Sequence, residues 1–237
     1  MKMRPRLVEV RQRVLKQNDL IARELRQRFL DSGIYVVSLV SSPGSGKTAF
    51  LERTLSLARQ KYRTAALVGD LATDNDAVRL ARSQAPVKQI TTGTVCHLEA
   101  EMIRNALDGW MDPQLELLFI ENVGNLVCPS SYDLGENLRL VLMSVTEGED
   151  KPLKYPTIYN TADVAIITKT DLAVAVEFDA AMAHTNIHAV RPGMEILDIS
   201  VKSGQGMENW MRLLESHITE ARAAHAGKET QSTGAVE

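Results

Sequence analysis

The sequence predicts an α/β fold in which a doubly wound, mainly parallel sheet carries helices on both faces. Continuous apolar, β-rich runs, of which IYVVSLV is the first, alternate along the chain with stretches of helical periodicity. This first run leads directly into SSPGSGKT, the pattern of a phosphate-binding loop between a strand and a helix. A chain of 237 residues with 44% hydrophobic content can bury one good-sized core. We therefore expect a single P-loop NTPase fold.

The predicted elements follow this alternation in order. Apolar residues recur at near-helical spacing from Leu7 to Phe29, until Asp31-Ser32-Gly33 supplies a stop, so a helix leads the chain. Further helices are expected at residues 49–60, 76–84, 94–107 and 207–224. Strands, some with the turn that follows them, are expected at residues 34–40, 64–70, 115–124, 138–148, 163–172 and 195–204. Right-handed crossovers then bring the carboxyl ends of the strands to one edge, where ligands bind.

Charge and composition exclude several classes of function. The net charge of −3 is small and the basic residues form no long run, so nucleic-acid binding is not expected. The N-terminus MKMRPRLVEV lacks the apolar core of a signal peptide, and no apolar stretch is long enough to span a membrane. We therefore expect a cytoplasmic protein without membrane contact. In a reducing compartment, Cys96 and Cys128 are expected as thiols or metal ligands rather than as a disulfide.

SSPGSGKT predicts a site for nucleotide phosphates. In such a loop the glycines let backbone N–H groups surround the phosphates, the lysine bridges the terminal two, and the following hydroxyl holds Mg²⁺. Ser41 takes the place of the outer glycine, which weakens the pattern, although serine can make the tight turn needed there. The alternative is a chance glycine-rich turn, which the strand before it and the helix after it disfavour. The expected phosphate-binding residues are Gly44, Ser45, Gly46, Lys47, Thr48 and Ala49.

A second motif favours guanine as the base. TKTD follows the apolar run VAII, where a guanine-binding loop is expected. Asp171 can accept both donors of the guanine edge, while the stem of Lys169 lies along the ring. Thr168 stands where this pattern usually has asparagine, a residue that ties loops together, so the support of the loop is left open. After the last predicted strand, Ser200 and Lys202 resemble the second base-contacting loop of GTPases.

Two acidic residues end predicted strands on the phosphate side. Asp70 and Glu121 can hold Mg²⁺ there, together with Thr48. Asp70 can also orient the attacking water, so Lys47 and Asp70 are the expected catalytic residues, and Gly124 can donate its N–H to the γ-phosphate. The alternative for either acid is solvated capping of the next helix. With no glutamine placed to position water and no evident arginine finger, turnover is expected to be slow.

The two cysteines and one histidine form a candidate site for a soft metal. Cys96 and His97 are neighbours at the start of a predicted helix, and Cys128 lies four residues beyond Gly124. Two thiolates and an imidazole suit Zn²⁺ or Ni²⁺ and leave one coordination position open, which a second copy of the chain can fill. The alternative is that the cysteines are small core residues, because free cysteine is among the most buried residue types.

Five segments together resemble a known family. SSPGSGKT, VGDLATDNDA, TTGTVCHLEA, LLFIENVGNLVCPSSYDLGE and TKTDL are similar, in this order, to the hydrogenase nickel-incorporation GTPases, accessory proteins of [NiFe]-hydrogenase maturation. The similarity runs from about Arg11 to His217. It implies a GTPase that dimerises through its nucleotide face, with Cys96, His97 and Cys128 as a nickel or zinc site at or near the subunit interface. It also implies that the GTP state controls metal transfer to a partner, either another maturation factor or the hydrogenase large subunit.

The expected organisation is a helix packed on the core, a GTPase domain and a disordered tail of polar and small residues, at residues 1–33, 34–225 and 226–237. The N-terminus has neither the cysteine motif nor the histidine-rich tract with which many relatives store nickel, so a storage role is not expected. Three other functions stay open: a urease-type accessory GTPase, a small-molecule kinase of the same fold, and a metal carrier with a vestigial nucleotide site.

Overall fold

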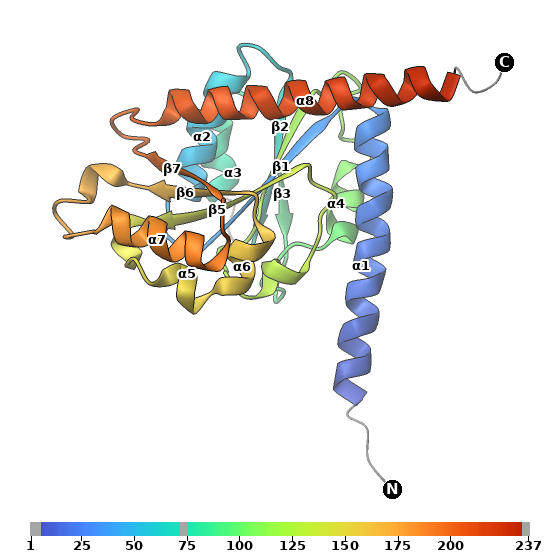
Figure 1. The fold of residues 1–237 in the computed structure, drawn as a ribbon. Helices are drawn as coiled ribbons and strands as arrows, with labels where there is room; N and C mark the ends of the chain where they lie inside the picture. The colour runs from blue at the N-terminus through green and yellow to red at the C-terminus, as the bar shows by residue number, and fades with distance from the viewer. Residues whose placement is uncertain (1–5, 72–74, 234–237) are drawn as a thin grey trace, which may run out of the picture.

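The core of the protein is one seven-stranded sheet in which every neighbouring pair of strands is parallel. The computed structural model describes residues 6–71 and 75–233 (Figure 1). The strand order is β3-β2-β4-β1-β5-β6-β7. The strands are β1 (Tyr35–Ser41), β2 (Thr64–Asp70), β3 (Val87–Thr91), β4 (Leu117–Glu121), β5 (Leu138–Ser144), β6 (Val164–Thr168) and β7 (Glu195–Ile199). The predicted sheet is thus confirmed, and it is entirely rather than mainly parallel.

Helices cover both faces of the sheet, as the doubly wound fold requires (Figure 1). The α-helices are α1 (Arg6–Asp31), α2 (Lys47–Ala58), α3 (Asn75–Leu80), α4 (Ala100–Leu107), α5 (Lys151–Lys154), α6 (Pro156–Thr161), α7 (Ala180–Val190) and α8 (Met207–Thr233). Short 3₁₀ turns are η1 (Ala81–Ser83), η2 (Cys128–Ser131), η3 (Val145–Glu147) and η4 (Thr170–Leu172). None of the described helices is long and apolar enough to cross a membrane.

Three apolar clusters fix these layers. One cluster joins α2, α3 and α8 to one face of the sheet, with Phe50 and Trp210 in tilted ring contact. On the other face, α1 and α4 pack over β1, β2 and β4, and α6 and α7 pack over β5 and β6. Ile21, Leu25 and Phe29 are the buried side of α1, so the amphipathic spacing of the leading helix is used to attach it to the sheet.

Several boundaries differ from the sequence expectation. The helix expected from residue 94 begins at Ala100, because the preceding residues form a loop with its own hydrogen bonds. Residues 226–233, expected as part of a disordered tail, continue α8, whose helical hydrogen bonds need no apolar side chains; residues 234–237 of that tail lie outside the described residues. Strand β3 and the helices α5, α6 and α7 were not predicted. In β3 the half-buried VKQIT has neither an apolar run nor a clean alternation.

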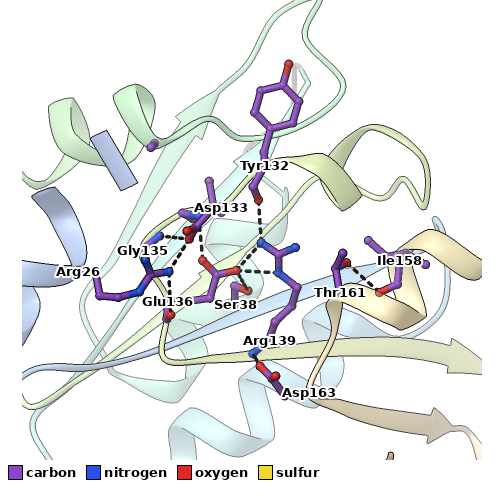
Figure 2. A network of polar contacts seen from close by, with 12 residues as sticks. Arg26, Ser38, Tyr132, Asp133, Gly135, Glu136, Arg139, Ile158, Thr161 and Asp163 are labelled. Carbon is purple, nitrogen blue, oxygen red and sulfur yellow. Dashed lines mark hydrogen bonds and ion pairs between the residues drawn. The ribbon is translucent and has the colours of Figure 1, made fainter. Parts of the chain in front are cut away.

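A buried polar network holds the loop between η2 and β5 (Figure 2). The Glu136 carboxylate accepts hydrogen bonds from Arg139 Nε at 2.7 Å and Ser38 Oγ at 3.0 Å. Arg139 also donates to the carbonyl of Tyr132 at 2.7 Å. Because Glu136 and Arg139 are each only 8% exposed, their charges are paired inside the protein, which ties this loop to strands β1 and β5.

Candidate nucleotide and metal sites

The phosphate-binding loop joins the central strand β1 to helix α2. Gly44 and Gly46 have φ of 75° and 89°, a left-handed backbone that favours glycine. Ser41, in contrast, is the last residue of β1, and its hydroxyl donates to the carbonyl of Ser42 at 2.8 Å. Glycine is therefore not needed at Ser41, because the chain is still in the strand at that residue.

A cavity of about 520 Å³ opens over this loop. Its lining includes all six residues expected to bind phosphate, together with Asp70, Gly124 and Lys169. Gly124 passes so close to the loop that a Cβ atom there would lie 3.0 Å from Pro43 Cα. Two further residues, Asp76 and Arg79 of α3, line the cavity and were missed by the sequence analysis, although VGDLATDNDA places an acid close behind Asp70.

Thr48, Glu121 and Asp76 converge where Mg²⁺ is expected. The Thr48 hydroxyl lies 2.7 Å from Glu121 Oε1 and 3.0 Å from Asp76 Oδ1, and Lys47 Nζ lies 3.2 Å from the same Glu121 oxygen. Glu121 is 1% exposed, and its Oε2 has no hydrogen-bond partner among the described residues. Burial raises the pKa of Glu121, and the positive charge of Lys47 opposes that rise. An unpaired buried carboxylate oxygen beside a hydroxyl fits a hard cation.

Asp70 lies at the end of β2 on the rim of the same cavity. Its carboxylate accepts the N–H of Leu71 at 2.7 Å. The segment after Asp70, which we expect the nucleotide to order, includes residues 72–74, and these lie outside the described residues.

The expected guanine readers line a second cavity of about 380 Å³, which shares Gly46, Ala49, Arg79 and Lys169 with the first. Asp171 and Lys202 lie in its wall. Ser200 is buried behind them, and its hydroxyl donates to Asp171 Oδ1 at 2.7 Å. Ser200 therefore orients the Asp171 carboxylate rather than lining the cavity.

Thr168 supports its loop in the place where the motif usually has asparagine. Its hydroxyl donates to the carbonyl of Ser45 in the phosphate loop and lies 3.2 Å from the carbonyl of Met143. Lys169 adds a second tie, because its Nζ donates to the carbonyl of Gly44 at 2.7 Å. The loop of Thr168 and Lys169 is thus hydrogen-bonded to the phosphate loop, although Thr168 stands in place of the usual asparagine.

Cys96, His97 and Cys128 come together although 30 residues lie between His97 and Cys128. Their potential ligand atoms all lie within 4.8 Å of one another, with 2.8 Å between the two sulfur atoms and 4.0 Å between Cys96 Sγ and His97 Nδ1. Both cysteines are free and half-buried. The sequence expectation that these residues cluster is met in space, and a set of two thiols and one imidazole fits Ni²⁺ or Zn²⁺.

The surroundings of His97 orient its ring. The ring contacts Tyr132 with 4.0 Å between centroids, and Nε2 lies 3.3 Å from Glu99 Oε1, so Nδ1 is the nitrogen near the sulfur atoms. Burial lowers the pKa of His97, which favours the neutral imidazole that binds metals, whereas Glu99 opposes the shift. The hydrogen bond with Cys128, and then burial, raise the pKa of Cys96.

The chain is similar to known proteins both in sequence and in structure. A family model described as the CobW/HypB/UreG nucleotide-binding domain matches residues 35–198. Hydrogenase maturation factor HypB of Azotobacter vinelandii is 45% identical over 210 residues, which cover 89% of this chain and 69% of that protein. Hydrogenase/urease maturation factor HypB of Helicobacter pylori (strain ATCC 700392 / 26695) is 40% identical and covered to 92% on both sides. The crystal structure of Helicobacter pylori HypB in complex with nickel superposes with a TM-score of 0.82 at 41% identity, over 86% of this chain and 96% of that one.

Proposed function

The chain belongs to the family of CobW/HypB/UreG nucleotide-binding domains, and from this premise we propose that it is a GTP-hydrolysing metallochaperone that binds nickel or zinc and assists nickel insertion during [NiFe]-hydrogenase maturation. The family assignment confirms the resemblance found in the sequence. The observation that carries the proposal is the cluster of Cys96, His97 and Cys128, which the segment after β4 links to the phosphate-binding loop through Gly124 and Asn125. The proposal extends to this chain the nickel bound in the Helicobacter pylori structure.

The nucleotide half of the proposal assigns hydrolysis of GTP to GDP and phosphate. The backbone of the phosphate loop and Lys47 bind the phosphates, and Asp70 orients the attacking water. Asp171 and Lys169 select guanine, and Thr168 keeps their loop in register with the phosphates. Mg²⁺, held by Thr48, Glu121 and the acids nearby, would neutralise charge on the terminal phosphates.

The coupling between nucleotide and metal rests on the short segment that follows β4. Asn122 is 1% exposed, and its side-chain oxygen accepts the N–H of Leu98, the residue after His97, at 2.9 Å. Asn125 donates to the carbonyl of Cys96 at 3.3 Å, and Gly124 lies against the phosphate loop. A change at the γ-phosphate that moves this segment therefore moves the ligand loop with it.

The proposal also includes partners and location. We propose a cytoplasmic homodimer, formed in response to the nucleotide, in which a second copy completes the metal coordination, and transfer of nickel to another maturation factor or to the hydrogenase large subunit. Val127, which is 62% exposed and adjacent to Cys128, supports this proposal as an apolar side chain available for contact with a second copy. Sedimentation of the GDP-bound and GTP-analogue-bound forms measures whether the dimer depends on nucleotide.

The test is a Ni²⁺ titration by calorimetry with the protein loaded either with GDP or with a non-hydrolysable GTP analogue, in the presence of Mg²⁺. The proposal expects an affinity or stoichiometry per chain that differs between the two nucleotides. The Asn122→Ala variant is expected to reduce this difference, and Asn105→Ala, which changes an exposed asparagine of α4, is the matched control. Equal binding in both states contradicts the coupling, and no binding contradicts the metal site.

Two alternatives are separated by simple measurements. A urease-type role is favoured by the name of the Helicobacter pylori relative, and hydrogenase and urease activities in a strain that lacks the gene distinguish the two. A metal carrier with a vestigial nucleotide site, or a small-molecule kinase, is tested by phosphate release from GTP without any acceptor. Steady release supports the GTPase, whereas none supports one of the alternatives.

A further inference from the structure

Asn18 of α1 lies between the two loops that carry the metal ligands. It is 5% exposed, and both polar atoms of its side-chain amide are hydrogen-bonded: Oδ1 accepts the N–H of Ala100 at 2.8 Å, and Nδ2 donates to the carbonyl of Asp133 at 2.8 Å. Ala100 follows the loop of Cys96 and His97, and Asp133 follows the turn that begins with Cys128. One side chain thus bridges two segments that are distant in sequence.

The bond to Ala100 satisfies the first backbone N–H of α4. Ala100 is the first residue of α4, so its N–H has no partner within the helix. Glu99, at the capping position, makes no side-chain capping bond within the described part of the chain, and its carboxylate lies instead 3.3 Å from His97 Nε2. Asn18 thus satisfies the N–H of the first helical residue, which the side chain of a capping residue does not reach, while the Glu99 carboxylate lies beside the imidazole.

The bond to Asp133 is part of a close contact between α1 and the second loop. Figure 2 shows Arg26 of α1 reaching the Asp133 carboxylate, at 2.7 Å. The backbone of Gly135 is so close to α1 that a Cβ there would lie 2.9 Å from the carbonyl of Ala22. Tyr132, next to Asp133, contacts the His97 ring. The position of α1 therefore sets the position of both ligand loops.

We propose that Asn18 is a positioning residue for the Cys96–His97–Cys128 site, and that its amide fixes the distance between the loop of Cys96 and His97 and the loop of Cys128. This inference rests on the proposed function, in which these three residues bind the metal. An amide is suited to the task because it accepts from one loop and donates to the other at the same time. The family model begins at residue 35, so this contribution comes from outside the part of the chain that it matches.

The experiment compares three variants with the wild-type chain. Asn18→Leu keeps the approximate size but removes both hydrogen bonds, and Asn18→Asp keeps the acceptor for Ala100 but loses the donor to Asp133. Arg28→Ala is the matched control, since Arg28 joins α1 to Asp108 at the far end of α4, at 3.4 Å. The readouts are Ni²⁺ affinity by chelator competition, the thiolate-to-nickel charge-transfer absorption, GTP hydrolysis and the thermal midpoint.

Loss of such an outer contact is expected to weaken Ni²⁺ binding of Asn18→Leu by about 10- to 100-fold and to shift or weaken the charge-transfer band. Asn18→Asp is also expected to weaken Ni²⁺ binding, because a carboxylate oxygen would then face the carbonyl oxygen of Asp133 at a buried position. GTP hydrolysis is expected to stay at the wild-type rate, because Asn18 does not line the nucleotide cavities. Wild-type Ni²⁺ affinity and spectrum in both Asn18 variants, or an equal loss in Arg28→Ala, would overturn the inference alone. Absence of Ni²⁺ binding in the wild-type chain would overturn the proposed metal function as well.

Discussion

The nucleotide cavity and the cluster of Cys96, His97 and Cys128 (the triad) are linked by the segment after β4, yet they are built by different means. The phosphate-binding part of the cavity is a contiguous loop at the end of the central strand, with left-handed glycines at Gly44 and Gly46. The triad is assembled from two loops whose spacing depends on the side-chain amides of Asn18, Asn122 and Asn125. The backbone of a strand and helix holds the first site, whereas the second depends on single long-range hydrogen bonds. The second site is therefore the one that a small movement elsewhere can adjust.

The largest effect is expected on GTP hydrolysis, from a change in the phosphate-binding loop. Lys47→Ala removes the phosphate-bridging cation and leaves the buried Glu121 without its ion-pair partner. We expect GTP hydrolysis to fall by roughly 1,000-fold, as for loss of a group that stabilises charge on the transferred phosphate. Phosphate release measures the loss, and Lys61→Ala, an exposed lysine paired with Glu215, is the control. Near wild-type turnover in Lys47→Ala would contradict the site assignment.

The next largest effect is expected on Ni²⁺ affinity, from the loss of one thiol of the triad. Cys128→Ser replaces a soft thiolate by a hydroxyl, and we expect Ni²⁺ affinity to fall by at least about 100-fold, because loss of a ligand costs more than loss of an outer contact. Chelator competition measures the affinity. Ser130→Ala, two residues further along in the same turn, is the control, since its hydroxyl bonds only to the carbonyl of Val127 among the described residues. Equal losses in both variants would assign the effect to the turn rather than to the sulfur.

A third effect sharpens the description of the base cavity. Asp171→Asn replaces one acceptor oxygen by a donor, so guanine loses a partner whereas xanthine, which has an oxygen at that position, gains one. We expect GTP affinity to fall by about 10- to 100-fold, the discrimination of one good paired contact, and xanthosine nucleotides to bind in its place. Competition with a fluorescent nucleotide measures both. If GTP and xanthosine triphosphate weaken together, Asp171 supports the loop without reading the base.

The smallest effect concerns the tie between the two nucleotide loops. Thr168→Val keeps the shape but removes the hydroxyl that donates to the Ser45 carbonyl. One such hydrogen bond contributes about 1 kcal/mol, so nucleotide affinity is expected to weaken by about fivefold. Thr168→Asn, which restores the residue usual in this motif, should bind nucleotide at least as well as the wild type. Unchanged affinity in Thr168→Val would show that Lys169 alone is sufficient for the tie.

The same contrast explains what the sequence could predict. The buried strands could be predicted because both of their faces are covered, so that their apolar runs are continuous. The phosphate loop could be predicted because its residues are contiguous in the sequence. Strand β3 was missed because an edge strand buries only part of its side chains. The start of α4 was placed too early because Val95, Leu98 and Met102 continue the apolar spacing of the helix into the preceding loop. That Cys96, His97 and Cys128 cluster was predictable from residue type and family resemblance.

The contacts that hold the triad could not be predicted. Asn18 lies 82 residues before Ala100 and 115 before Asp133, and an asparagine on a helix carries no local signal of a distant partner. Asn122 was quoted only as part of a motif, although its oxygen bonds to the ligand loop. Such contacts depend on how α1 and α4 lie against each other, which follows from packing of the whole domain rather than from any local pattern (Figure 1).

Because α1 is a helix, the number of residues between Asn18 and β1 decides where the Asn18 amide points. Each residue of an α-helix turns the chain by about 100° and advances it by about 1.5 Å. A single insertion between Asn18 and the start of β1 would rotate the amide away from both ligand loops, even if every buried side chain nearer the sheet stayed in place. An insertion before Asn18 would leave the direction of the amide unchanged, because the helix between Asn18 and β1 keeps its length.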